Sequence, residues 1–246
     1  IIDPYSIICI ICYSFQFNKF ISNLMTSIYL VRHGQASFGK KDYDNLSEIG
    51  EKQSFLLGEH FKKLKLNFDK IYVGTLKRQI QTSEQILKNY ENKINIERTQ
   101  LLNEYDVKSV LTGFVNGREL TYDELHNKKT HFNLLRNSVM AWSENKITYS
   151  VNETWDQFEK RAETFLNLFK ETKKNNILVI SSGGTISMIL RLLLNLPSDQ
   201  FANFHFQIYN SSYSKIKINE NGMALSLFNC ISHLEMERNS DIITYV

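Results

Sequence analysis

The sequence is poor in cysteine and in proline. Its 246 residues contain only three cysteines and two prolines. An odd and sparse set of cysteines excludes a disulfide framework and favours a reducing compartment, so we expect a cytoplasmic protein. Because prolines are so few, no Pro-rich linker divides the chain. Its length fits one large α/β domain, or one domain with an inserted lobe.

The sequence also lacks a basic stripe and a long apolar run. Its formal net charge is +3, and its lysines are scattered rather than grouped. A nucleic-acid-binding protein usually carries a clustered basic patch, so we predict no nucleic-acid partner. The apolar run from Tyr5 to Phe17 has about 13 residues, which is too short to cross a bilayer as a helix. We therefore expect no stable membrane association.

The first 24 residues differ in composition from the rest of the chain. They lack the positively charged start that a signal peptide needs. Cys9 and Cys12 form a CxxC inside the apolar run, with no second pair at zinc spacing, so we interpret them as apolar residues. Met25 directly precedes a strand-like run. We expect residues 1–24 to be a non-core extension and the natural protein to begin at Met25; a membrane-associating tail is the alternative.

From Met25 onward, strand-like and helix-like runs alternate. This alternation predicts an α/β three-layer sandwich, in which helices flank both faces of a mainly parallel sheet. A closing hairpin adds antiparallel pairing at one edge. Residues 106–150 break the alternation, and we predict a small helical lid over the carboxyl ends of the strands, where such sheets bind ligands. The predicted strands are 27–31, 70–73, 94–97, 177–180, 212–218 and 223–228, and the predicted helices are 51–65, 75–89 and 185–196.

Polar side chains follow three of the predicted strands. Arg32 and His33 end the first strand, Arg78 lies in the first turn after the second, and Glu104 follows the third. Imidazole is a competent nucleophile near neutral pH, and the arginine fork matches phosphate oxygens. A helix start favours anions, and a carboxylate can carry a proton. The sequence therefore predicts a phosphoryl-transfer pocket at one edge of the sheet.

Over nearly all of residues 25–246, the chain resembles the histidine phosphatase superfamily, which has the phosphoglycerate mutase-like fold. The order and spacing of several motifs carry this resemblance. They are Leu30-Val31-Arg32-His33-Gly34-Gln35, Leu46-Ser47-Glu48-Ile49-Gly50, Thr75-Leu76-Lys77-Arg78 with Gln81-Thr82, Glu104, Glu153-Thr154-Trp155 with Arg161, Ile177 to Gly184, and Asn229 with His233-Leu234.

The resemblance implies a role for each matching residue. His33 would be the phosphorylated nucleophile, and Arg32 and Arg78 would hold the phosphoryl oxygens. Glu104 would protonate the leaving alcohol and then activate water. The resemblance implies no metal and no organic cofactor, because the arginines supply the positive charge. The expected partner is a small-molecule phosphomonoester, and the sequence indicates no oligomeric state.

One position departs from the usual pattern of the family. Ser182 stands where the family usually has a second pocket histidine, as in a subgroup that shares this Ser-Gly-Gly. Ser182 could donate one hydrogen bond to a phosphoryl oxygen, and Gly183 could offer its backbone N–H, but neither carries charge. His233 is an alternative donor with precedent in the family. The remaining histidines are assigned to the surface or to packing: His60, His126, His131 and His205.

The leading interpretation is a phosphomonoester hydrolase that works through a phosphohistidine on His33. Because Ser182 lacks charge, the activity could be weak, and the alternative is a phosphatase-like protein that binds a phosphorylated ligand or partner. A phosphoglycerate-type mutase is the third candidate. It is disfavoured because Ala36 and Gly39 stand where mutases tend to carry polar phosphate donors.

Overall fold

The computed structural model describes residues 26–37, 44–91, 94–170, 172 and 175–245. The predicted extension 1–24, its cysteine pair and Met25 lie outside the described residues. None of the helices in these ranges is long and apolar enough to cross a bilayer.

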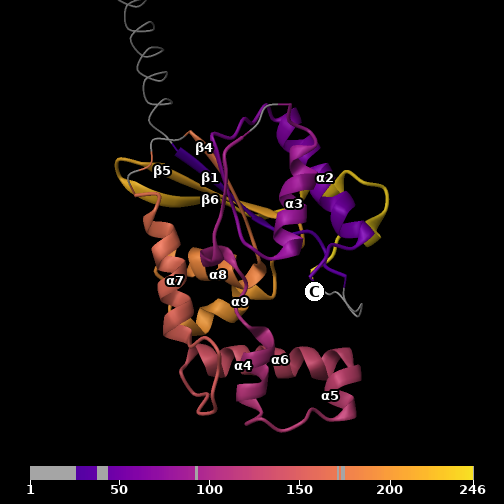
Figure 1. Cartoon of the computed structure of the whole chain (residues 1–246), viewed down its shortest axis with the longest axis vertical. Coiled ribbons are helices and arrows are strands. Elements are labelled where there is room, and N and C mark those ends of the chain that lie inside the picture. Colours follow the sequence, from indigo (N-terminus) through magenta and orange to yellow (C-terminus); the bar gives the residue numbers. More distant parts are fainter. Residues whose placement is uncertain (1–25, 38–43, 92–93, 171, 173–174, 246) are drawn as a thin grey trace, which may run out of the picture.

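A six-stranded sheet runs through the middle of the molecule (Figure 1). Its strand order is β3-β2-β4-β1-β5-β6. The first four strands in this order pair in parallel, and β5 and β6 each pair antiparallel with the strand before them. The predicted parallel sheet with an antiparallel edge hairpin is therefore confirmed. The strands are β1 (Thr26–Arg32), β2 (Lys70–Val73), β3 (Ile96–Arg98), β4 (Asn176–Ser181), β5 (Tyr213–Asn219) and β6 (Gly222–Cys230).

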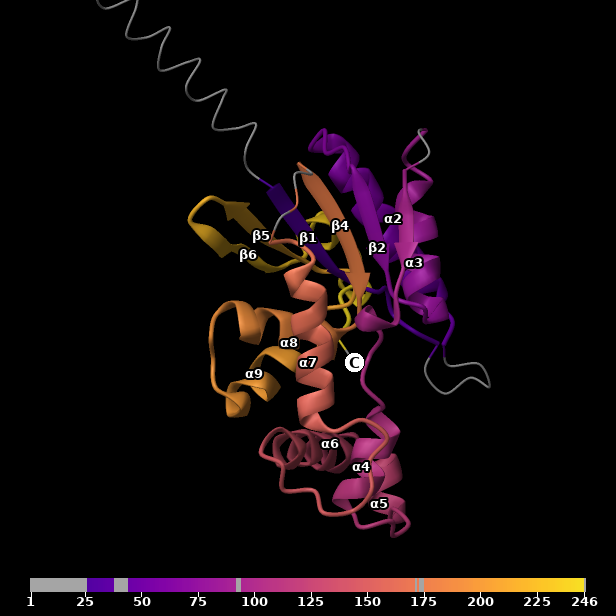
Figure 2. The same ribbon diagram turned by 60° about the vertical axis from the view of Figure 1, so that its left-hand side comes forward.

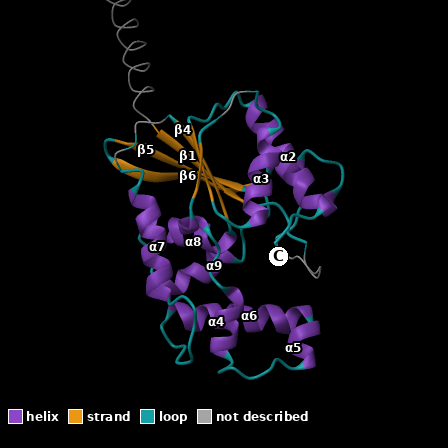
Figure 3. Cartoon of the chain, in the orientation of Figure 1, coloured by secondary structure: helices purple, strands orange, loops and turns teal. Residues whose placement is uncertain are grey.

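Helices cover both faces of the sheet, which confirms the predicted three layers (Figure 3). One face carries α2 (Glu48–Lys63) and α3 (Lys77–Leu87), and the other carries α7 (Trp155–Asn167), α8 (Gly183–Leu193) and α9 (Phe201–His205). Shorter helical segments lie between or after these elements: η1 (Gln100–Leu102), η2 (Ser198–Gln200), α10 (Ser232–Glu235) and η3 (Ser240–Ile242).

The side chains of β1 explain why the central strands are apolar throughout. Ile28 and Leu30 belong to the core beneath α7 and α8, whereas Tyr29 and Val31 belong to the core beneath α2 and α3. Successive side chains of a strand point to opposite faces, so a strand that is buried on both faces needs an unbroken apolar run. This burial fixes the direction of β1 and the place where its carboxyl end delivers His33.

The helix α2 begins earlier than the apolar periodicity alone predicts. Its first residue is Glu48 rather than Glu51, because the side chain of Ser47 accepts a hydrogen bond from the backbone N–H of Gly50 at 3.1 Å. Such a cap satisfies a donor that the first helical turn leaves unpaired. The cap rather than the first apolar residue therefore sets the start of the helix.

The helical segment between η1 and α7 lies beyond the carboxyl ends of the parallel strands (Figure 2). It contains α4 (Val107–Phe114), α5 (Tyr122–His126) and α6 (Lys128–Ser143). Trp142 is 2% exposed, and its ring lies 4.9 Å from that of Tyr105, whereas Tyr122 is 79% exposed. Trp142 therefore anchors the segment to the core of the molecule. Its role as a lid stays a prediction.

Replacing Phe61 by alanine should lower the free energy of unfolding by about 3–5 kcal/mol. Phe61 is fully buried on α2, and its ring contacts those of Tyr29, Phe68 and Tyr213. Phe55→Ala, on the same helix but 38% exposed, is the matched control and should have a much smaller effect. Urea unfolding measures both variants. Equal losses of stability would contradict the assignment of Phe61 to the core.

Candidate active site

His33 directly follows the carboxyl end of β1, and both nitrogen atoms of its ring have hydrogen-bond partners. Its Nδ1 lies 2.7 Å from the carbonyl oxygen of Gly34, and the Nε of Arg78 donates to its Nε2 at 3.1 Å. A carbonyl oxygen can only accept, so Nδ1 carries the ring proton and Nε2 presents a lone pair. The predicted meeting of His33 and Arg78 is therefore observed, and the nitrogen available for attack is Nε2.

The surroundings of His33 keep its ring neutral. The side chain is 5% exposed, and burial is the main cause that lowers its pKa well below 6.5. The positive charges of Arg78 and then Arg32 lower the pKa further, whereas the hydrogen bond to Gly34 works against them. A neutral imidazole keeps the lone pair that a nucleophile requires.

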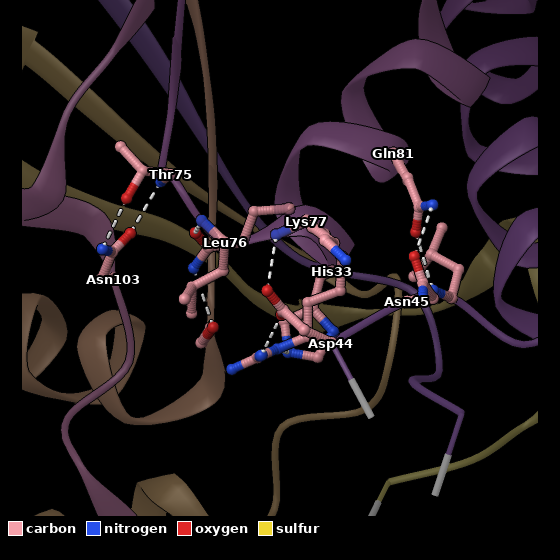
Figure 4. Close-up of polar contacts among 12 residues, drawn as sticks. His33, Asp44, Asn45, Thr75, Leu76, Lys77, Gln81 and Asn103 are labelled. Atoms are coloured by element: carbon pink, nitrogen blue, oxygen red, sulfur yellow. Dashed lines mark hydrogen bonds and ion pairs between the residues drawn. The ribbon is translucent and has the colours of Figure 1, made fainter. Parts of the chain in front are cut away.

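Arg78 is held by a carboxylate that the sequence did not single out. Its guanidinium Nη1 lies 2.5 Å from Oδ1 of Asp44, and the backbone N–H of Lys77 donates to Oδ2 of Asp44 at 2.9 Å (Figure 4). The ion pair orients the guanidinium toward His33 at the start of α3. No motif marks Asp44, because the loop that carries it has no periodicity that would place it beside α3.

Glu104 lies at the amino end of α8, as its position after the third strand suggested. The backbone N–H of Gly184 donates to Oε2 at 3.0 Å, and that of Tyr105 donates to Oε1 at 3.2 Å. A Cβ on Gly184 would lie 2.3 Å from Oε1, so the close approach of this carboxylate depends on glycine. Glu104 therefore sits beside Gly183 and Gly184, at a helix end that favours anions.

Arg161 on α7 holds the segment that presents Glu104. Its guanidinium binds Glu153 through two hydrogen bonds of 2.8 and 2.9 Å, and its Nη1 donates to the carbonyl of Asn103 at 2.7 Å. The side chain of Asn103 in turn exchanges two hydrogen bonds of 2.7 Å with Thr75, after β2 (Figure 4). The ends of β2 and β3 are thereby tied together one residue before Glu104.

Arg32 is the second arginine whose charge acts on His33. Its guanidinium Nη1 donates to the carbonyl oxygen of Ile208, and its Nε faces the backbone of Gly183. Its positive charge lowers the pKa of both His33 and His205. Arg32 and Arg78 therefore both act on His33 from the ends of β1 and β2, and Arg32 also borders Gly183.

Ser182 is fully buried and faces α3. The amide of Gln79 donates to its hydroxyl oxygen at 2.8 Å and to the carbonyl of Leu102 at 2.9 Å. Gln79 is itself fully buried. The sequence analysis did not single it out, because a glutamine in a helix is usually exposed to solvent. The role of Ser182 as a phosphate donor stays a prediction.

One of the histidines assigned to the surface or to packing lies close to the site. His205 does pack, with its ring stacked 5.4 Å from that of Phe201, but it also lies beside Gly183 and Arg32, with Nε2 3.0 Å from the hydroxyl of Tyr105. His233 lies elsewhere: it is 4% exposed, its Nε2 is 3.2 Å from the hydroxyl of Ser211, and its ring packs 6.0 Å from that of His60. Only a contact map could have revealed His205, because the five-residue helix that ends with it has no motif.

Across the described ranges, no group of three or more His, Cys, Asp or Glu side chains could hold a metal ion. The cations that are present near His33 are the guanidinium groups of Arg32 and Arg78. Such groups can bind a phosphoryl dianion through paired N–H donors.

Replacing Arg161 by methionine should lower the free energy of unfolding by about 2–3 kcal/mol, because it leaves Glu153 and two backbone carbonyls without their charged donor. The amide hydrogen of Gly184, which binds Glu104, should also exchange faster. Lys160→Met is the matched control, since its ion pair with Glu163 is exposed and contributes little. Urea unfolding and amide exchange measure the effects; equal behaviour of the two variants would contradict the positioning role.

Comparisons with known proteins agree with this geometry. A protein of Hydrogenobacter thermophilus, provisionally named phosphoserine phosphatase 2, is 26% identical over 215 residues, which cover 85% of this chain and 98% of that protein. Two solved structures share the fold. A phosphoserine phosphatase from Entamoeba histolytica in complex with 3-phosphoglyceric acid has a TM-score of 0.62 at 21% identity, covering 85% of this chain and 99% of that chain. A phosphoglycerate mutase from Bacillus anthracis has a TM-score of 0.61 at 18% identity, covering 87% of this chain and 97% of that chain.

The predicted phosphoglycerate mutase-like fold is therefore confirmed. A sequence profile of the histidine phosphatase superfamily (branch 1) matches residues 28–231, a range that includes every residue of the site described above. The chain belongs to the histidine phosphatase superfamily.

Proposed function

We propose that this chain hydrolyses small phosphomonoesters through a covalent phosphohistidine on His33. The observation that carries the proposal is the state of the His33 ring, whose Nδ1 donates to Gly34 while its Nε2 keeps a lone pair. Membership of the superfamily supports phosphoryl-transfer chemistry, and the name of the Hydrogenobacter relative supports a small phosphorylated substrate.

In the first step, the Nε2 of His33 attacks phosphorus and a P–N bond forms. The bond from phosphorus to the ester oxygen breaks, and Glu104 in its acid form gives its proton to that oxygen, so that a neutral alcohol leaves. Arg32 and Arg78 bind the phosphoryl oxygens and stabilise the charge that they carry in the transition state.

In the second step, water attacks the phosphorylated ring. The carboxylate of Glu104 takes a proton from water while the oxygen of that water bonds to phosphorus, and the P–N bond breaks. The electron pair of this bond returns to Nε2, inorganic phosphate leaves, and Glu104 is again an acid. Both steps balance without an additional reactant.

Arg78 changes partners in this mechanism. Its Nε donates to Nε2 of His33, and its Nη1 binds Asp44. A bound phosphoryl group offers two oxygens with a greater affinity for guanidinium, so Nε leaves the lone pair as substrate enters. The arginine thus holds the nucleophile in place until the phosphoryl group arrives.

The second candidate is a protein that binds a phosphorylated ligand with little turnover. The observation that favours it is the hydrogen bond from Gln79 to Ser182, which turns the hydroxyl at position 182 toward α3. Position 182 then contributes no charge to the phosphoryl group. The position of Glu104 against the amino end of α8 favours the hydrolase, since a binding protein needs no proton carrier there.

The test is to incubate the protein with 4-nitrophenyl phosphate and to follow both nitrophenol release and acid-labile phosphate bound to the chain. The wild type should turn over and carry phosphate on His33. In His33→Ala, turnover should fall by at least about 10³-fold, since the nucleophile is lost. His126→Ala, on exposed helix α5, is the matched control and should retain full activity.

Two outcomes would reject the hydrolase. Turnover that survives in His33→Ala would exclude the covalent route. Tight binding of phosphate esters by the wild type, with neither turnover nor phosphohistidine, would establish the second candidate in its place.

A further inference from the structure

Two nitrogen atoms face one point in space above the first residue of α8. Gly183 has no side chain, and the position that its Cβ would take lies 3.5 Å from the Nε of Arg32 and 3.6 Å from the Nδ1 of His205. The backbone N–H groups at the start of a helix also favour an anion there. Donors from β1, α8 and α9 thus converge on a single place beside His33.

The Nδ1 of His205 is buried and has no hydrogen-bond partner among the described residues. A buried polar atom without a partner is unfavourable and calls for an explanation, such as a ligand that completes it. The other ring nitrogen, Nε2, lies 3.0 Å from the hydroxyl of Tyr105. The geometry therefore leaves one nitrogen of this ring for a group that binds above Gly183.

The tautomer of His205 follows from Tyr105. Burial, followed by the nearby Glu104 charge, raises the pKa of Tyr105 well above 10, so the phenol keeps its proton. This proton can be donated to Nε2, which places the ring proton of the neutral imidazole on Nδ1. His205 then presents an N–H donor toward Gly183.

His205 can also acquire charge when an anion binds. Burial is the main reason why the pKa of His205 lies as low as about 4. The charge of Glu104 raises this pKa, the charge of Arg32 lowers it further, and the backbone of Gly183 raises it. The groups that face the ring are thus one carboxylate, one guanidinium and the phenol of Tyr105. A phosphoryl dianion would add a second and closer negative charge, which favours the protonated ring.

We propose that His205 is a phosphate-binding residue of this site, whose Nδ1–H donates to a phosphoryl oxygen that lies above Gly183 and is shared with Arg32. His205 thereby supplies, from α9, the imidazole that position 182 lacks. This inference rests on the proposed phosphatase function, because it assigns a further donor to the same phosphoryl group.

The packing around Ser182 shows why an imidazole from α9 is needed. The carboxamide of Gln79 fills the space beside Ser182, and its Oε1 lies 1.8 Å from the position of a Cβ on Gly74. A glycine at position 74 therefore lets Gln79 approach Ser182 from α3 and bind its hydroxyl. Ser182 itself brings no imidazole, so an imidazole for the phosphoryl group has to come from another element, and α9 ends beside Gly183.

The first experiment replaces His205 by glutamine, with His126→Gln as the matched control. Glutamine keeps a hydrogen-bonding side chain but cannot become cationic. With 4-nitrophenyl phosphate, kcat/KM should fall about 10²–10³-fold in His205→Gln, the loss typical of one donor aimed at developing charge. The control should match the wild type. An unchanged kcat/KM in His205→Gln would overturn the inference, while His33 phosphorylation in the same samples would show that the proposed function still stands.

The second experiment separates binding from folding. In Gly183→Ala, the added methyl group would meet its nearest neighbours at 3.5–3.7 Å, which are ordinary contact distances, so the protein should keep its stability. The methyl group would nevertheless project into the space above Gly183 where the phosphoryl oxygen would bind. Inorganic phosphate should bind at least about 10-fold more weakly, a loss of one strong hydrogen bond. Unchanged phosphate affinity in a stably folded Gly183→Ala would overturn the inference.

The third experiment needs no turnover. Imidazole resonances are followed by NMR while inorganic phosphate is added to the wild type and to His33→Ala. The pKa of His205 should rise from about 4 in both proteins when phosphate binds, because the anion favours the cation. Phosphate that binds without raising this pKa, or that does not bind, would overturn the inference. If phosphate raises the pKa of His205 but the wild type shows no turnover, the proposed function is rejected and the inference about His205 still holds.

Discussion

The hydrogen bond from Nδ1 of His33 to the carbonyl of Gly34 is the contact on which the chemistry of the site depends. It fixes both the tautomer and the direction of the ring, so that Nε2 faces the guanidinium of Arg78. The turn that permits it requires glycine, since a Cβ on Gly34 would lie 2.3 Å from the carbonyl oxygen of Gly50 on α2. The backbone of Gly34 is held in addition by Thr82 on α3, at 3.0 Å. The packing of both helices against one face of the sheet therefore sets the state of a single imidazole.

Around this ring, positive charge and burial act together. The two arginines that can bind a phosphoryl group also lower the pKa of His33, so in the proposed mechanism the charges that would attract the substrate also keep the nucleophile unprotonated. Asp44 counters one of these charges and directs the guanidinium of Arg78. The groups arrive from the ends of several strands. Asn103, held by Arg161, ties the end that carries Glu104 to the end that leads to Arg78. The fold brings these side chains close together, and their charges and ring nitrogens determine the chemistry that the site can perform.

Much of this arrangement could be predicted from the sequence, for identifiable reasons. The carboxyl ends of parallel strands meet at one edge, so Arg32, His33 and Arg78 could be placed together before any coordinates were known. The positions of Asp44 and Gln79 could not be predicted, because their contacts depend on how a loop and one face of a helix pack against the rest of the site. The nearness of His205 to Gly183 could not be predicted, because α9 is a five-residue helix without amphipathic periodicity, and only tertiary packing brings the two together. The contact of Ser182 with Gln79 could not be predicted either, because it joins two elements that are far apart in the sequence.

The most direct test of this account is the protonation state of His33, measured by NMR of ¹⁵N-labelled imidazole. We predict the neutral tautomer with the proton on Nδ1 at pH 7. Because burial and the two arginines lower the folded-state pKa, the ring should stay neutral as the pH falls through 6.5, the ordinary pKa of a histidine side chain. An Nε2–H tautomer at pH 7, or an imidazolium already formed at pH 6.5, would contradict the account, because Nε2 would then have no lone pair for phosphorus.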